Sequence, residues 1–126
     1  MNIDITEADI ASLVPAFYYR VRQDTVLGPI FNGAIDDWPG HLETLTAFWS
    51  SVILTSGRYK GQPMVAHFRH EQVMTAENFA RWLGLWEEVS SAVLPREKAA
   101  IFQEKAGRIA ESLELGIRFQ RERRAA

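Results

Sequence analysis

The chain has 126 residues, the size of one domain, and 47% of them are hydrophobic, which is enough to build a buried core. The formal net charge is −2, so the strong basic excess of a dedicated nucleic-acid-binding domain is absent and we expect no nucleic-acid partner. Without cysteine, the chain cannot form a disulfide framework, a thiolate zinc site or a cysteine nucleophile. The sequence has no apolar run long enough to span a membrane, and its acidic N-terminal residues do not have the layout of a secretory signal. We therefore expect no membrane association and a cytoplasmic location.

The first third of the chain predicts one long helix and one short helical turn. The long helix begins after Thr6, because Thr6 and Asp9 have the spacing of a capping box. Its apolar residues then recur at helical spacing: Ile10, Leu13, Val14, Phe17 and Val21. Residues 27–31 form the short helical turn, and residues 32–37 form a loop.

The middle of the chain predicts a second long helix that runs to about Leu54. Asp36 or Asp37 can cap its start, and Pro39 suits its first turn. Its apolar stripe consists of Leu42, Leu45, Phe48 (or Trp49) and Val52. A loop over residues 55–63 follows, and residues 63–70 form another short helix.

The last part of the chain predicts two more long helices. Thr75 can cap the first, and Pro95 suits the first position of the second. The apolar residues of the former are Phe79, Trp82, Leu83, Trp86 and Val93, and those of the latter are Phe102, Ala106, Ile109, Leu113 and Ile117. No segment alternates with the period of two that half-buried strands show. We therefore predict an all-α fold in which residues 1–126 form a single domain.

The three histidines are His41, His67 and His70, and without cysteine any transition metal must rely on them and on carboxylates. His67 and His70 are three residues apart, which can present both to one ion. No carboxylate follows at metalloprotease spacing, so the pattern does not favour a zinc site. His41 shares the apolar face of its helix with Leu45.

Tyr18 and Trp82 also lie on apolar faces of their helices. Alone, either is more often an ordinary core residue whose polar tip is satisfied locally. However, a buried hydroxyl or indole N–H needs a partner, and so small a chain has little core in which to hide several such groups. Together with His41, they favour a pocket with polar groups on its walls.

Five stretches of the chain carry a further signal. In chain order they are Phe17-Tyr18-Tyr19-Arg20-Val21-Arg22, Leu27-Gly28-Pro29-Ile30-Phe31, Phe48-Trp49-Ser50-Ser51-Val52, Tyr59-Lys60-Gly61-Gln62-Pro63-Met64 leading into His67, and Phe79-Ala80-Arg81-Trp82-Leu83. In this order and spacing they resemble group III of the truncated haemoglobins. The resemblance implies a globin-like, truncated two-over-two helical sandwich that holds haem b non-covalently.

The resemblance also implies roles for seven residues. His67 would bind the haem iron through an imidazole nitrogen. Tyr18, His41 and Trp82 would surround the ligand on the opposite side, as donors or as a gate. The residues implied to contact the porphyrin or line the cavity are Phe31, Leu45 and Phe48. Four residues stay open as partners for the haem propionates: Arg58, Lys60, Arg69 and His70.

Three functions are compatible with these residues. The first is the binding of dioxygen and related small ligands at a five-coordinate iron, with slow release because polar groups donate to the ligand. The second is a haem-dependent peroxidase-like or nitric-oxide-detoxifying enzyme, which would need a separate reductase. The third is a haem-free helical interaction module built on Trp38, Trp86 and the C-terminal arginines, although a solvated helix end is the simpler interpretation of those arginines.

Overall fold

The computed structural model describes residues 4–68 and 70–125, and within these residues it is helical without strands. The long helices are α1 (Glu7–Gln23), α3 (Trp38–Leu54), α5 (Ala76–Val93) and α6 (Arg96–Ala125). The short ones are α2 (Leu27–Ala34), α4 (Pro63–Phe68) and the 3-10 helix η1 (Glu71–Val73). The all-α prediction is confirmed.

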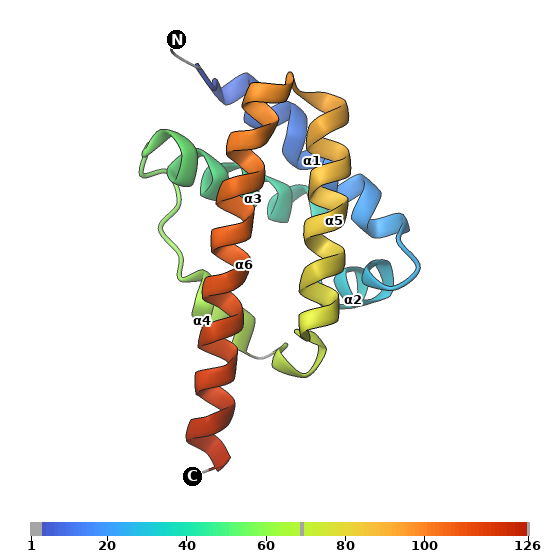
Figure 1. Cartoon of the computed structure of the whole chain (residues 1–126), viewed down its shortest axis with the longest axis vertical. Helices are drawn as coiled ribbons and strands as arrows, with labels where there is room; N and C mark the ends of the chain where they lie inside the picture. The colour runs from blue at the N-terminus through green and yellow to red at the C-terminus, as the bar shows by residue number, and fades with distance from the viewer. Residues whose placement is uncertain (1–3, 69, 126) are drawn as a thin grey trace.

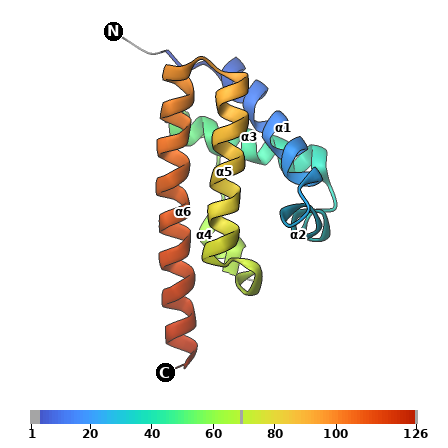
Figure 2. The ribbon, with the colours of Figure 1, turned by 45° about the vertical axis from the view of Figure 1, so that its right-hand side comes forward.

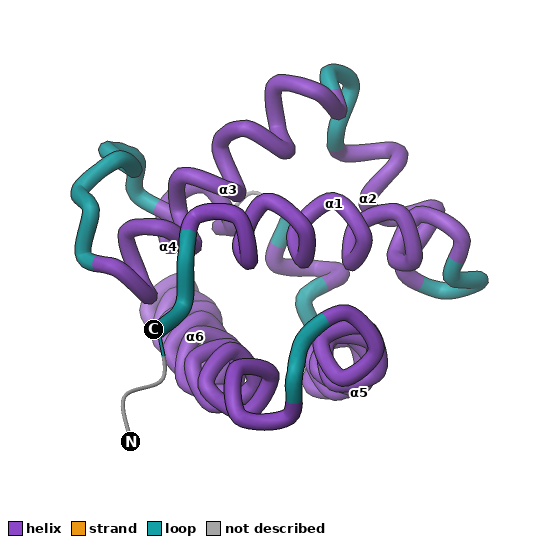
Figure 3. Tube along the Cα trace, turned by 90° about the horizontal axis from the view of Figure 1, so that it is seen from above, coloured by secondary structure: helices purple, strands orange, loops and turns teal. Residues whose placement is uncertain are grey.

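The long helices form two layers. The antiparallel helices α5 and α6 lie side by side in one layer (Figures 1 and 2), and α1 and α3 cross them in the other (Figure 3). This is the two-over-two arrangement that the resemblance implies. The short helix α4 lies beside α6, after the long loop that follows α3. None of the helices in the described ranges combines the length and apolarity needed to cross a bilayer.

The predicted helix starts are confirmed by their capping hydrogen bonds. The backbone N–H of Asp9 donates to the Thr6 hydroxyl at 3.2 Å, and the Thr6 N–H donates to the Asp9 carboxylate at 2.9 Å, which completes the capping box. Asp37 and Thr75 each accept from the backbone N–H three residues further on, at 3.1 Å in both cases. These local bonds satisfy N–H groups that have no partner inside a helix.

Three boundaries differ from the prediction. Helix α2 continues to Ala34, into the predicted loop, where the Asn32 side chain accepts from Arg22 Nε at 3.0 Å and donates to the Arg22 carbonyl at 3.3 Å. This contact, between residues ten apart in the chain, orders the segment from Asn32 to Ala34, whose composition alone predicts a turn or loop. Helix α4 ends at Phe68 rather than at residue 70. Pro95 lies one residue before α6, and its carbonyl accepts from Ala99 at 2.9 Å.

The core is aromatic and lies where α1, α3, α5 and α6 meet. The rings of Trp49 and Trp86 are stacked, with centroids 4.5 Å apart and an interplanar angle of 16°. Phe17 packs edge-on against Trp86 at 4.6 Å, and the Trp86 indole donates to the Phe102 carbonyl at 3.1 Å. Such aromatic pairs add to the stability that their buried area already provides.

Trp38 and Trp86 are 8% and 0% exposed, respectively. The hypothesis that Trp38 and Trp86 form part of an interaction surface is therefore wrong, because neither side chain is available to a partner. Part of the arginine tail is also engaged within the chain. Arg124 pairs with the Glu71 carboxylate, and Arg121 donates to the Glu71 carbonyl.

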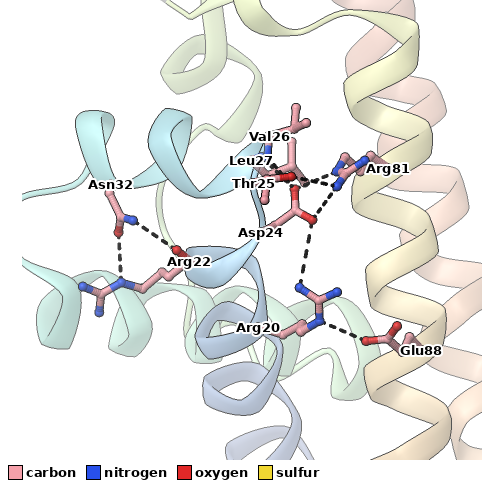
Figure 4. Close-up of polar contacts among 9 residues, drawn as sticks. All are labelled: Arg20, Arg22, Asp24, Thr25, Val26, Leu27, Asn32, Arg81 and Glu88. Atoms are coloured by element: carbon pink, nitrogen blue, oxygen red, sulfur yellow. Dashed lines mark hydrogen bonds and ion pairs between the residues drawn. The ribbon is translucent and has the colours of Figure 1, made fainter.

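Asp24 joins the end of α1 to the start of α2 and to α5 (Figure 4). Its carboxylate is buried and accepts from Arg81 Nε at 2.6 Å and from Arg81 Nη2 at 2.9 Å. Arg81 holds the pKa of Asp24 well below its ordinary value of 3.8, against the effect of burial. The ionised pair therefore stabilises the fold most strongly above that value.

We predict that Asp24→Asn lowers the free energy of unfolding at neutral pH. The difference from the wild type should shrink as the pH falls below about 3.8, because the unfolded chain then protonates this carboxyl group while the folded state, with its lowered pKa, keeps it ionised. Urea unfolding of both proteins at neutral pH and near pH 3 measures this. A difference that stays constant over this range would contradict the role of the ionised carboxylate.

Candidate functional site

A cavity of about 640 Å³ lies between the two helix layers. This volume falls within the range of roughly 300–1,000 Å³ that small-molecule and cofactor sites occupy. All six α-helices contribute to its walls, and most of the lining side chains are apolar, for example Ile30, Phe79 and Leu113. The chain therefore encloses a space large enough for an organic cofactor.

All seven residues singled out in the sequence line this one cavity. Tyr18 comes from α1, Phe31 from α2, His41, Leu45 and Phe48 from α3, His67 from α4, and Trp82 from α5. They are spread over more than half of the chain. The fold brings all of them together.

The imidazole of His67 is oriented by its own helix. Its Nδ1 lies 2.5 Å from the Pro63 carbonyl oxygen, one turn earlier in α4. A carbonyl can only accept, so Nδ1 carries the proton and Nε2 keeps a free lone pair. A backbone carbonyl on one ring nitrogen is the usual support for a histidine that binds metal through the other. His67 thus has the tautomer of a metal ligand.

Tyr18 is 5% exposed and packs against the rings of Phe31 and His41, with centroid distances of 5.9 and 6.5 Å. Burial raises the pKa of Tyr18 above its ordinary value of 10.0, and the nearby Trp82 indole N–H acts in the opposite direction. The phenol therefore stays protonated. Tyr18 lines the cavity, so its proton can be donated to a ligand there.

His41 is half-buried and packs edge-on against Trp38, with ring centroids 5.9 Å apart. Burial lowers the pKa of His41, and the electrostatic effect of the nearby His67 ring lowers it further. Both effects favour the neutral imidazole, which can donate from one ring nitrogen and accept at the other.

The Trp82 ring is held by the aromatic core. It stacks on Trp86 at 5.6 Å with an interplanar angle of 12°, and Phe17 meets it edge-on at 5.5 Å. The Trp82 ring also borders the cavity. Two packed neighbours therefore set the orientation of its indole N–H.

The sequence analysis missed several lining residues. Tyr59, in the loop before α4, packs edge-on against Phe48 at 5.3 Å; it belongs to one of the five matching stretches, but no role was assigned to it. Ile109 and Leu113 of α6 also line the cavity. Their spacing predicts an ordinary core stripe, and no sequence signal separates a core wall from a cavity wall.

The candidate propionate partners are not equivalent. His70 lines the cavity, whereas the Arg58 guanidinium pairs with Glu7 at 2.7 Å. Lys60 is exposed, and Arg69 lies outside the described residues. Within the described part of the chain, no group of three or more His, Cys, Asp or Glu side chains could hold a metal ion by itself.

Several apolar wall residues are only partly buried, unlike the core. Ile30, Phe31, Leu45, Phe48 and Trp82 pack against the core on one side and border the cavity on the other. Apolar side chains facing a void lack contacts that a filled interior would provide. A largely apolar group with one position for a nitrogen ligand would suit these walls.

Two known proteins similar to this chain are group III truncated haemoglobins. No protein-family model matches the chain. The chain is 36% identical over 110 residues to the group 3 truncated hemoglobin ctb of Campylobacter jejuni, which covers 84% of this chain and 86% of the relative. The crystal structure of group III truncated hemoglobin from Campylobacter jejuni is similar, with a TM-score of 0.80 and 33% identity, over 93% of this chain and 95% of that one.

We predict that Tyr18 does not ionise when an alkaline titration reaches the ordinary tyrosine pKa near 10. Tyr18→Phe should therefore leave the rise of tyrosinate ultraviolet absorbance near that pH unchanged. Loss of part of this signal in Tyr18→Phe would show that the hydroxyl is not protected by burial.

Proposed function

Because the chain belongs to the group III truncated haemoglobin family, we propose that it holds haem b non-covalently in the cavity and binds dioxygen and related diatomic ligands there. The observation that carries this proposal is the Nδ1 contact of His67 with Pro63, which leaves Nε2 as a metal ligand in a cofactor-sized cavity. The absence of cysteine is compatible with haem held without covalent links.

The residues that line the cavity fit haem. His67 would bind the iron through Nε2, and Phe31, Leu45 and Phe48 would contact the apolar macrocycle. When bound, haem supplies an iron with an open coordination position for a diatomic ligand. Apolar neighbours such as Ile30 exclude water from the surroundings of that position, which strengthens polar interactions made there.

Tyr18 and Trp82 would act on the ligand as hydrogen-bond donors. The Tyr18 hydroxyl stays protonated because it is buried, and the Trp82 indole N–H lies near it. A hydrogen bond to a charged partner contributes about 1.5–3 kcal/mol, and each 1.4 kcal/mol changes a rate or an equilibrium about tenfold. Donation to a ligand that carries partial negative charge would therefore slow its release about ten- to a hundredfold. His41 would donate from its neutral imidazole or control entry.

We predict that His67→Gly loses most of its haem or holds it without the spectrum of a histidine-ligated iron. Imidazole added to this variant should restore that spectrum, because a free imidazole can replace the missing ring. Visible absorption of the reduced protein, with and without carbon monoxide, is the measurement. A histidine-ligated spectrum in His67→Gly without imidazole would exclude His67 as the ligand.

We predict that Tyr18→Phe releases dioxygen at least about tenfold faster than the wild type, because one hydrogen bond to the ligand is lost. Stopped-flow displacement of dioxygen by carbon monoxide measures the rate. The control is Tyr19→Phe, whose ring is exposed and does not line the cavity, and it should keep the wild-type rate. Equal rates in Tyr18→Phe and the wild type would refute the role of the Tyr18 hydroxyl.

The polar side chains Tyr18, His41 and Trp82 on the same cavity also favour a second function, the consumption of peroxide or nitric oxide. Such donors can polarise an O–O bond as well as retain a ligand. A separate reductase would have to supply the electrons. Steady-state turnover with hydrogen peroxide, or with nitric oxide and a reductant, would distinguish this function from ligand binding alone.

A further inference from the structure

One buried carboxylate organises the corner next to the Tyr18 and Trp82 donors. Asp24 follows α1 and precedes α2, and its Oδ2 accepts from the backbone N–H groups of Val26 at 3.0 Å and Leu27 at 2.9 Å. The backbone carbonyl of Asp24 also accepts from Gly28 at 2.9 Å. The start of α2 is thus tied directly to the end of α1.

The same corner allows almost no movement of the backbone. A Cβ added to Gly28 would lie 2.7 Å from the backbone carbonyl oxygen of Arg22, closer than Cβ atoms come to other atoms. Only glycine permits this approach of α2 to α1. Because Phe31 lies one helical turn after Leu27, the corner also places Phe31 against Tyr18.

Arg81 extends this arrangement to α5. Its Nε and Nη2 donate to the two oxygens of Asp24 at 2.6 and 2.9 Å, a two-point contact that fixes direction as well as distance (Figure 4). Arg81 directly precedes Trp82, and successive residues of an α-helix point about 100° apart. A fixed position for the Arg81 guanidinium therefore limits the rotation of α5 that would swing the Trp82 indole within the cavity.

A second ion pair joins the same helices but has weaker geometry. Arg20 of α1 donates to Glu88 of α5 at 3.1 Å, with side chains that are 39% and 59% exposed. Water and salt screen such an exposed pair. Arg20 lies 4.0 Å from the Asp24 carboxylate, beyond hydrogen-bonding distance. Glu88 has no contact with Asp24, so replacing Glu88 breaks this link between α1 and α5 and leaves both arginines beside the Asp24 carboxylate, which offers an internal control.

We propose that Asp24 and Arg81 are positioning residues for the ligand site, which hold the Trp82 indole N–H and the Phe31 ring in place relative to the Tyr18 hydroxyl. The inference rests on the proposed function of the cavity. The Asp24–Arg81 contact lies outside the cavity and would affect how a ligand is held inside it.

The test uses the haem-loaded protein and three variants: Arg81→Met, Arg81→Lys and Glu88→Gln. The readouts are the C–O stretching frequency of the carbon monoxide complex, the Trp82 indole resonance in that complex, and the dioxygen dissociation rate. We expect Arg81→Met to shift the frequency and the resonance and to release dioxygen about tenfold faster, because small displacements at a preorganised site have large effects on rates. Arg81→Lys should be intermediate, because an ammonium keeps the charge but loses the two-point contact. Glu88→Gln should match the wild type, because it breaks only the exposed pair with Arg20.

Two results would overturn the proposal. One is a wild-type C–O frequency and dissociation rate in Arg81→Met, even if its thermal unfolding midpoint falls, since that is a structural role only. The other is an equal effect in Glu88→Gln, since that reflects general loosening of α1 and α5. If Arg81→Met does not fold, Asp24→Asn and Arg81→Lys carry the same expectations and the same refutations. A wild-type protein without a Soret band or a carbon monoxide complex would instead refute the proposed function.

Discussion

A chain of 126 residues that keeps a cavity of about 640 Å³ open must concentrate its packing elsewhere. The close packing typical of protein interiors is found at the crossing of the long helices, where Trp49, Trp86 and Phe102 are fully buried. Several apolar side chains of the cavity walls, by contrast, are only partly buried. A cofactor that fills this space would add the missing contacts and would stabilise the fold through its own binding free energy. Fold and cofactor are therefore coupled by the same apolar surface.

The residues of the candidate site lie on both short and long helices. The metal-ligand candidate, His67, lies on the short helix α4 and is oriented by a carbonyl of that helix. The proposed donors Tyr18 and Trp82 lie on long helices and are held by aromatic neighbours in the core. Donors on rigid elements keep their direction when a ligand arrives, which is what preorganised hydrogen bonding requires. The Asp24 corner adds a polar restraint to the apolar packing that orients them.

Local chemistry made much of this structure predictable. Thr6, Asp37 and Thr75 cap their helices with side-chain oxygens, and such bonds form between near neighbours in the chain. The aromatic and histidine spacing, read through the family resemblance, indicated seven residues that all line one cavity. The misjudged segments lack a local signal. Asn32 is helical because Arg22 holds its amide, and the roles of Ile109 and Leu113 as wall residues depend on how α6 crosses the other layer.

The sequence by itself determined the helices, most of their starts and the all-α class, because propensity, capping and apolar period act within a few residues. The family was indicated by the five matching stretches. Only the tertiary structure decided which apolar faces pack against each other and which border the cavity. An apolar stripe of the same spacing can do either. The tertiary structure also decided that Asp24 meets Arg81, 57 positions away. Such contacts depend on the crossing of helices, and no spacing along the chain encodes that distance.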